Sequence, residues 1–161
     1  MERVFLATAH EEETHTLGHR LGQLMMAGCV LALRGDLGMG KSVLARGILR
    51  GLGVKDPYLT SPTFTILNYY EDGRLPASHF DFYRLAEPEE LLALGVRDYL
   101  PGDGVAMVEW PEKAMEFLPA DRLDIFLTDG CQGPESRTVT ITASGPLSRG
   151  LMHDYRQRFP E

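Results

Sequence analysis

Cysteine is scarce in this sequence: Cys29 and Cys131 are the only two among 161 residues. They form no Cys-x-x-Cys pair, so neither a disulfide framework nor a zinc site is indicated. Long apolar runs are also missing, and none approaches the roughly 20 residues of a transmembrane helix. Glu2 and Arg3 precede only a short apolar patch, which does not resemble a signal peptide. We therefore expect no membrane association and a cytoplasmic location.

Basic residues do not outnumber acidic residues either. Lys and Arg number 16 against 23 Asp and Glu, which gives a formal net charge of −7. This balance argues against a nucleic acid held on a broad basic face, although it does not exclude a local basic patch. The apolar fraction of 43% suits a globular fold. We expect residues 1–161 to form a single domain, with residues 146–161 as an extra helix or a loosely ordered tail.

What the sequence does contain is a phosphate-binding motif from Gly35 to Ser42, GDLGMGKS, which fits G-x-x-x-x-G-K-[ST]. An apolar run at residues 29–33 precedes it and a helical pattern at residues 42–50 follows it, as the motif requires. Glycines let backbone N–H groups surround a phosphate at the positive end of the helix. Lys41 adds charge for the outer phosphates, and Ser42 offers a hydroxyl to Mg²⁺. The stretch predicts binding of a nucleoside triphosphate.

The remaining patterns alternate between strands and helices. Strands are predicted at residues 3–7, 29–34, 64–70, 78–83, 105–110, 122–127 and 137–143, and helices at residues 11–26, 42–50, 87–95, 111–117 and 146–158. Asp72-Gly73 is a strong hairpin signal between two of the strands. A second hairpin is expected around residues 129–133. The pattern therefore predicts an α/β unit with antiparallel insertions.

Three polar residues are candidates for chemistry beyond phosphate binding. Glu109 ends an apolar run, where an acid can hold Mg²⁺ directly or through water, or simply form a salt bridge. Asp81 is flanked by aromatic residues, and it either orients water or pairs with Arg84 or His79. Thr63 follows a proline, and it either contacts Mg²⁺ and the γ-phosphate as a switch residue does or caps an ordinary turn.

Together these residues resemble the TsaE (formerly YjeE) family, small bacterial P-loop ATPases of tRNA threonylcarbamoyladenosine synthesis. The likeness runs from about Thr8 to about Ile141, with the same order and spacing of motifs. It rests on four segments: Gly35 to Lys41, Ser61 to Thr65, His79 to Leu85 and Val108 to Pro111. Two departures stand out, because Ser42 occupies a position where the family usually has threonine and Met39 a position where it usually has alanine. Serine keeps the hydroxyl.

The resemblance implies a fold and an activity. The fold is a three-layer P-loop NTPase fold with a mixed, mainly parallel central sheet and antiparallel hairpin additions. The activity is Mg²⁺-dependent ATP hydrolysis, weak alone and stronger with the TsaD and TsaB proteins. That assembly transfers a threonylcarbamoyl group to the adenosine 3′ of the anticodon in tRNAs reading codons that start with A. The acidic chain fits a role in which the partners contact most of the tRNA.

The resemblance also implies roles for individual residues. The phosphates are held by Leu37, Gly38, Met39, Gly40, Lys41 and Ser42. Ser42 and Glu109 hold Mg²⁺. Hydrolysis is served by Lys41, Asp81 and the switch-like Thr63. Glu11 and Thr14 lie near the nucleotide base, and Arg137 approaches the nucleotide from a C-terminal hairpin.

Other functions remain open at this point. A P-loop small-molecule kinase is the main alternative, but it needs an arginine-bearing lid, and Arg84, Arg97 and Arg137 are scattered. A GTP switch is disfavoured because Asn-Lys-x-Asp and Asp-x-x-Gly are missing from the sequence. A scaffold that binds nucleotide without turnover is a third alternative. His79 is interpreted as a structural or supporting residue, and Trp110 as either a stacking or a core residue.

Overall fold

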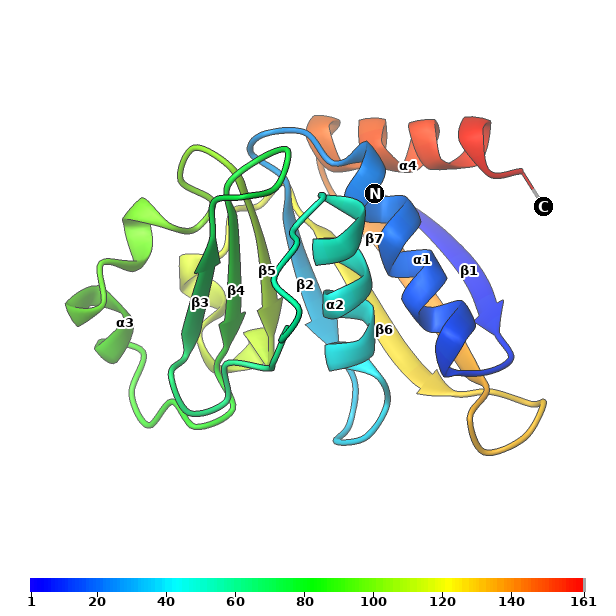
Figure 1. Ribbon diagram of the computed structural model, residues 1–161, viewed down its shortest axis with the longest axis horizontal. Coiled ribbons are helices and arrows are strands. Elements are labelled where there is room, and N and C mark those ends of the chain that lie inside the picture. Colours follow the sequence, from blue (N-terminus) through cyan, green and yellow to red (C-terminus); the bar gives the residue numbers. More distant parts are fainter. Residues whose placement is uncertain (161) are drawn as a thin grey trace.

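The computed structural model describes residues 1–160, which build one seven-stranded sheet with helices around it (Figure 1). The strands are β1 (Glu2–Thr8), β2 (Val30–Arg34), β3 (Leu67–Tyr70), β4 (Ala77–Asp81), β5 (Val105–Glu109), β6 (Leu123–Asp129) and β7 (Arg137–Ala143). The helices are α1 (Glu11–Leu24), α2 (Lys41–Gly51), α3 (Glu90–Ala93) and α4 (Pro146–Arg158), with 3₁₀ turns at Val96–Asp98, Pro111–Lys113 and Met115–Phe117. Within residues 1–160, every helix falls short of the length and apolarity needed to cross a bilayer.

The sheet is mixed, with a parallel centre. Its strand order is β1-β7-β6-β2-β5-β4-β3. The four central strands, from β6 to β4, pair in parallel. At the two sides, β7 and β1 extend the sheet in antiparallel fashion, and so does β3. The first four residues of β2 are buried, as expected for a parallel strand covered on both faces. The predicted α/β fold with antiparallel hairpin additions is confirmed.

Two hydrophobic cores lie on opposite faces of this sheet. The larger core joins apolar side chains of α1, α2 and α4, such as Leu21, Leu44 and Leu151, to one face. The smaller core surrounds Phe80 and Phe82 and is covered by α3 and the 3₁₀ turns. Figure 1 shows α1 and α2 side by side in front of the strands, with α4 running across one end. The result is a layered molecule in which helices or turns cover both faces of the sheet.

A glycine seam, formed by Gly18 and Gly22 of α1 and by Gly47 and Gly51 of α2, lets these two helices approach closely. A Cβ atom on Gly18 would lie 3.1 Å from the Cα of Gly47, and one on Gly22 would lie 3.0 Å from the Cα of Gly51. Side chains at these positions would therefore force the helices apart. The seam explains why two amphipathic helices carry glycine on the faces where they meet.

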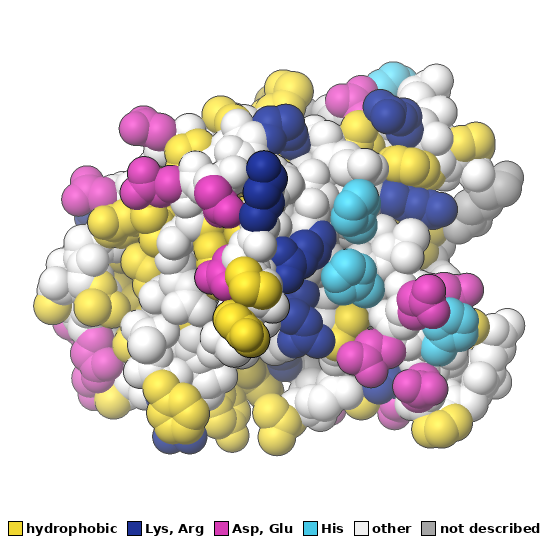
Figure 2. Space-filling model, viewed as in Figure 1, with side chains coloured by type: hydrophobic (Ala, Val, Ile, Leu, Met, Phe, Trp, Pro, Cys, Tyr) yellow, Lys and Arg dark blue, Asp and Glu magenta, His cyan; other side chains and the backbone are white. Residues whose placement is uncertain are grey.

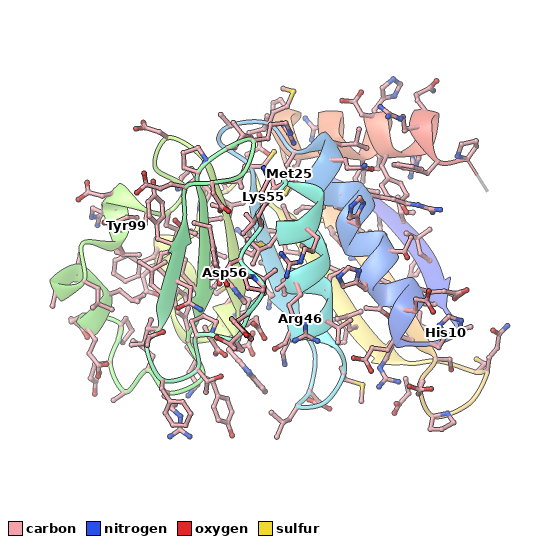
Figure 3. The ribbon with its side chains drawn as sticks, viewed as in Figure 1. His10, Met25, Arg46, Lys55, Asp56 and Tyr99 are labelled. Atoms are coloured by element: carbon pink, nitrogen blue, oxygen red, sulfur yellow. The ribbon has the colours of Figure 1, made fainter. Side chains whose placement is uncertain are left out.

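One edge of the sheet gathers the segments that the sequence singled out. The carboxyl ends of the parallel strands β2, β4 and β5 meet at the lower edge in Figure 1, where the loop to α2 also lies. Helix α1 begins at the same edge, because His10 lies at its lower end and Met25 at its upper end (Figure 3). In α/β sheets this edge is where ligands bind.

Most predicted elements agree with the structure to within two residues at each end, and three differ by more or in type. The strand predicted at residues 64–70 begins only at Leu67, because Ile66 has a left-handed backbone (φ 69°) that an extended strand does not contain. The helix predicted at residues 87–95 is a single turn, α3, closed by the left-handed Gly95. Residues 111–117 form two 3₁₀ turns interrupted at Ala114. All three differences arise from backbone geometry that apolar periodicity does not encode.

Candidate nucleotide-binding site

The loop between β2 and α2 has the backbone that its glycines permit. Gly40 immediately precedes α2 and has a left-handed backbone with φ 104°. Gly35 has φ 144°, and a Cβ atom there would lie 2.7 Å from the carbonyl oxygen of Leu127. Both positions therefore require glycine. The loop leads directly into the N-terminal end of α2, where free N–H groups and the helix dipole favour an anion.

A cavity of about 400 Å³ opens beside this loop. Its lining includes every residue that the sequence proposed for the site: Glu11, Thr14, Leu37, Gly38, Met39, Gly40, Lys41, Ser42, Thr63, Asp81, Glu109 and Arg137. It also includes Val43, Ser61, Tyr83, Trp110 and Glu135. The fold thus brings residues from well-separated stretches of the chain to one cavity.

Lys41 is almost fully buried at the base of the cavity, with 5% of its surface exposed. Its ammonium group donates to the carbonyl oxygen of Gly35 and, at 3.4 Å, to that of Asp36. The same group lies 3.7 Å from the centroid of the Trp110 ring, within cation–π range. Burial lowers the pKa of Lys41 from its ordinary value, and the nearby Glu109 carboxylate opposes that shift. The amine is therefore held by the loop carbonyls and the indole.

Glu109 ends β5 and is buried, yet both of its carboxylate oxygens accept hydrogen bonds. Oε1 accepts from the Ser42 hydroxyl at 3.1 Å. Oε2 accepts from His79 Nε2 at 2.7 Å and lies 3.4 Å from the Ser61 hydroxyl. Burying a carboxylate is costly unless such donors compensate for lost water. Glu109 thus joins the first turn of α2 to strand β4.

Asp81 lies beside Glu109, because the two are register partners on the parallel strands β4 and β5. Its Oδ1 accepts from the Tyr83 backbone N–H at 2.9 Å. Its Oδ2 accepts from the hydroxyls of Ser61, at 3.1 Å, and Thr63, at 3.0 Å. Two carboxylates therefore lie side by side at the cavity, and Ser61 is within hydrogen-bond range of both.

Two residues with unusual backbone conformations flank these carboxylates. Trp110, directly after Glu109, has φ 56°, and Ile66 has φ 69°. The Ile66 carbonyl accepts from the Asp81 N–H at 2.9 Å, and its N–H donates to the Pro62 carbonyl at 2.8 Å. A left-handed backbone is strained for large or β-branched residues and tends to occur at functional sites. Here it turns the Trp110 ring towards the cavity and anchors the loop that carries Thr63.

The guanidinium group of Arg137 contacts the glycine-rich loop. Its Nε donates to the Met39 carbonyl at 2.9 Å, and Nη2 donates to the Gly38 carbonyl at 3.2 Å. Its Nη1 bonds carbonyls of its own hairpin, those of Pro134 and Ser136. The residue lines the cavity as the resemblance implies, but its donors are engaged with backbone. Arg137 therefore braces the loop from the first residue of β7.

The N-terminal residues implied to lie near the base are placed differently from one another. Thr14 is buried, its hydroxyl lies 2.8 Å from that of Thr8, and its methyl group lies beside Gly40. Glu11 is exposed and lies 4.0 Å from Arg46. Both line the cavity, so helix α1 forms part of its wall.

The donor set suits Mg²⁺ bound together with phosphates. Magnesium prefers oxygen ligands and usually combines one or two carboxylates with substrate phosphates. Ser42 and Glu109 offer such oxygens 3.1 Å apart. Within residues 1–160, no group of three or more His, Cys, Asp and Glu side chains has the geometry of a metal cage. The residues thus fit a metal that arrives with a nucleotide.

Positive charge gathers on one face of this acidic molecule. Figure 2 shows Lys, Arg and His side chains over α1 and α2, and Figure 3 shows Arg46 on α2 with Lys55 beyond its end. Burial lowers the pKa of His15, and the charges of His19, Arg46 and Arg50 lower it further. The negative net charge is therefore unevenly distributed, and this face carries the local basic patch that composition left open.

Sequence reasoning assigned no role to several residues that the structure places at the site. Ser61 was visible beside Thr63 in Ser-Pro-Thr, but its contact with both carboxylates depends on the loop conformation. Trp110, interpreted from the sequence as either a stacking or a core residue, does both, because its ring lies over Lys41 and packs against the smaller core. Glu135 and Tyr83 also line the cavity, and no pattern in the sequence around them indicates a role there. Arg84, an alternative partner for Asp81 in the sequence, instead stacks on the exposed Phe64 ring at 4.2 Å.

Comparison with known proteins agrees with this geometry. A family model described as "Threonylcarbamoyl adenosine biosynthesis protein TsaE" matches residues 8–139. The chain belongs to the TsaE family. It is 40% identical to the TsaE protein of Nostoc sp. over 144 residues, covering 87% of this chain and 86% of that protein. It is 39% identical to TsaE of Bacillus subtilis over 145 residues, covering 90% and 89%.

A solved structure matches the fold of this TsaE family member. The crystal structure of Bacillus subtilis YdiB superimposes with a TM-score of 0.81 at 34% sequence identity, covering 98% of this chain and 96% of that one. Membership places the chain in tRNA threonylcarbamoyladenosine biosynthesis. The P-loop ATPase fold of the family indicates that it uses a nucleotide.

Proposed function

We propose that this chain is the Mg²⁺-dependent ATPase subunit for threonylcarbamoylation of the adenosine 3′ of the anticodon in tRNAs reading codons that start with A. It acts with the TsaD–TsaB complex, and its hydrolysis is weak alone and stronger with these partners. One observation carries the proposal: the Ser42 hydroxyl lies 3.1 Å from Glu109 Oε1, beside Lys41 and Asp81, in a single cavity. Phosphate, metal and water ligands thus converge at the end of a P-loop.

The loop binds the phosphates in this proposal. Backbone N–H groups of residues 37–42 surround the β- and γ-phosphates at the N-terminal end of α2. The Lys41 ammonium group exchanges the Gly35 carbonyl for phosphate oxygens, which are stronger acceptors because they are charged. Arg137 keeps the loop in shape through the Met39 and Gly38 carbonyls. Helix α1 contributes Glu11 and Thr14 on the side of the base.

Ser42 and Glu109 hold the metal. Bound there, Mg²⁺ would supply positive charge against the negative charge that develops on the phosphates. The Ser42–Glu109 hydrogen bond keeps the two oxygens that would hold the metal next to each other. Glu109 carries the negative charge that the metal requires, and its burial keeps that charge from being screened by water.

Asp81 and Thr63 serve hydrolysis. A water oxygen attacks the γ-phosphorus and the bond to the ADP oxygen breaks. ADP and inorganic phosphate form, and one water proton is released to solvent. Asp81 orients that water and accepts its hydrogen bond, while the Thr63 hydroxyl ties the loop to Asp81 at 3.0 Å. Positioning of this kind accounts for most phosphoryl-transfer catalysis by proteins.

The partners hold most of the tRNA in this proposal, because the chain carries a net charge of −7 and its positive face is narrow. The site of action is the cytoplasm, and residues 1–161 act as a single domain.

The test is ATP hydrolysis by the purified chain, alone and with TsaD and TsaB, with GTP as the control nucleotide. We expect weak activity alone, an increase with partners, and selectivity for ATP. No stimulation, with phosphate passing to a small acceptor instead of water, would replace the proposal with the small-molecule kinase. If the chain binds nucleotide but hydrolyses it neither alone nor with the partners, the protein would be a nucleotide-binding scaffold instead of an ATPase.

A further inference from the structure

His79 is a buried residue next to the site with one unused ring nitrogen. Its side chain is 2% exposed, and Nε2 lies 2.7 Å from Glu109 Oε2. Nδ1 is buried without a hydrogen-bond partner, and no other buried side-chain nitrogen or oxygen in residues 1–160 shares that condition. Buried polar atoms are normally paired, so the exception requires an explanation.

The contact with Glu109 determines where the ring proton lies. A carboxylate only accepts hydrogen bonds, so Nε2 must carry a proton at 2.7 Å. The geometry therefore places a proton on Nε2 and leaves Nδ1 without a partner.

The contact also restricts the Glu109 side chain, which has several rotatable bonds. His79 lies two residues before Asp81 on β4, on the same face of the strand, and its register partner is Met107 on β5. It therefore contacts Oε2 of Glu109, whereas Ser42 contacts Oε1, the other oxygen of the same carboxylate. Without it, Oε2 would keep only the Ser61 hydroxyl at 3.4 Å.

We propose that His79 is a positioning residue, whose Nε2–H holds the Glu109 carboxylate so that Oε1 faces Ser42. The inference rests on the proposed role of Glu109 as a metal ligand and extends it to a side chain that does not touch the metal. Hydrogen bonds of this kind, donated to the carboxylate ligands of a metal, orient those ligands. Nδ1 has no hydrogen-bond partner because the ring is oriented for the single contact through Nε2.

A pair of amide substitutions separates the two ring nitrogens. The amide nitrogen of glutamine is as many bonds from Cβ as His Nε2, whereas that of asparagine corresponds to Nδ1. We therefore expect His79→Gln to preserve the contact with Glu109 and His79→Asn to lose it. An exposed histidine, His153, provides a matched control through His153→Asn.

The main measurement is Mn²⁺ affinity of the full-length protein bound to a non-hydrolysable ATP analogue, read from the paramagnetic resonance signal of free Mn²⁺. We expect His79→Asn to weaken Mn²⁺ binding on the order of tenfold, with His79→Gln and His153→Asn close to wild type. Equal losses in His79→Gln and His79→Asn, or no loss in His79→Asn, would overturn the inference.

Two further measurements keep the result interpretable. Glu109→Gln tests the underlying role: unchanged Mn²⁺ affinity there would refute the proposed metal ligand, whereas a loss there without a loss in His79→Asn would refute only His79. The ¹⁵N spectrum of the wild-type protein tests the ring directly, even if the variants fail to fold. A proton on Nε2 supports the inference, and a ring whose single proton lies on Nδ1 contradicts it.

Discussion

The Lys41 ammonium group lies 3.7 Å from the centroid of the Trp110 ring, and the left-handed backbone of Trp110 directs the ring there. Trp110 is the chain's only tryptophan. The phosphate-binding lysine and the indole therefore form one contact at the base of the cavity. A nucleotide that draws the amine to its phosphates changes the surroundings of this single fluorophore.

Tryptophan emission should accordingly report nucleotide binding. We expect titration with ATP and Mg²⁺ to change the emission in a saturable way, because the ring exchanges a cation contact for a nucleotide. Trp110→Phe contains no tryptophan and is the control for emission that does not come from Trp110. Its ATP affinity is measured by calorimetry. Saturable calorimetric binding to the wild-type protein with no change in emission would show that Lys41 stays on the ring.

Burial of Lys41 should cost stability. Because burial lowers its pKa, the folded state holds the proton less tightly than the unfolded state. The full cost applies below the lowered pKa, and stability recovers as pH rises from there towards 10.5, the ordinary value. We expect Lys41→Met to be more stable than wild type at about pH 7, with the difference shrinking as pH rises.

Urea unfolding of both proteins across this pH range measures the effect, and nucleotide binding serves as the functional control. Lys41→Met should lose ATP binding while gaining stability, as expected when a residue serves function at the expense of folding. A less stable variant at about pH 7 would mean that the contacts with Gly35 and Trp110 outweigh the cost of burial.

Asp81→Asn should separate binding from hydrolysis. The amide keeps the size of the side chain but loses the charge that orients water, so we expect turnover to fall by about 10²–10⁴-fold. ATP affinity should stay near that of wild type, because the phosphates are held by residues 37–42. Single-turnover hydrolysis and equilibrium binding, both with the partners present, give the two quantities. Normal turnover would remove Asp81 from the mechanism.

The glycine seam predicts a strong position dependence for alanine. In Gly47→Ala the new methyl group would overlap the carbonyl of His15 on α1, so we expect a loss of about 1–3 kcal/mol in the free energy of unfolding. A methyl group on Gly150, in the exposed part of α4, would meet no atom within 4 Å, so Gly150→Ala should gain about 0.5–1 kcal/mol. Chemical denaturation of the two variants compares them directly. Equal effects would contradict the seam.

Much of the site was predictable because its chemistry is local in sequence. The P-loop occupies eight consecutive residues, and the apolar run before Glu109 identifies a strand that ends at the same edge. Asp81 was identified by the aromatic residues around it, which form the smaller core. In each case a short pattern implies both the element and the position of the side chain on it.

Other contacts in the site could not be predicted, because they depend on how distant parts of the chain are brought together. Whether His79 reaches Glu109 is decided by the register of β4 against β5, which no local pattern specifies. The loop that brings Ser61 to both carboxylates ends at the left-handed Ile66, a conformation that isoleucine rarely adopts. Propensity reasoning instead extended a strand across these residues. Tertiary hydrogen bonds overrode that preference.

The glycine seam has a mechanical consequence. Because α1 and α2 touch backbone to backbone, we expect the cavity wall built by α1 to move together with the phosphate-binding end of α2. Widening of the cavity for nucleotide exchange is then expected from the loop that carries Ser61 and Thr63. A protein bound to this loop would control nucleotide exchange without touching the P-loop.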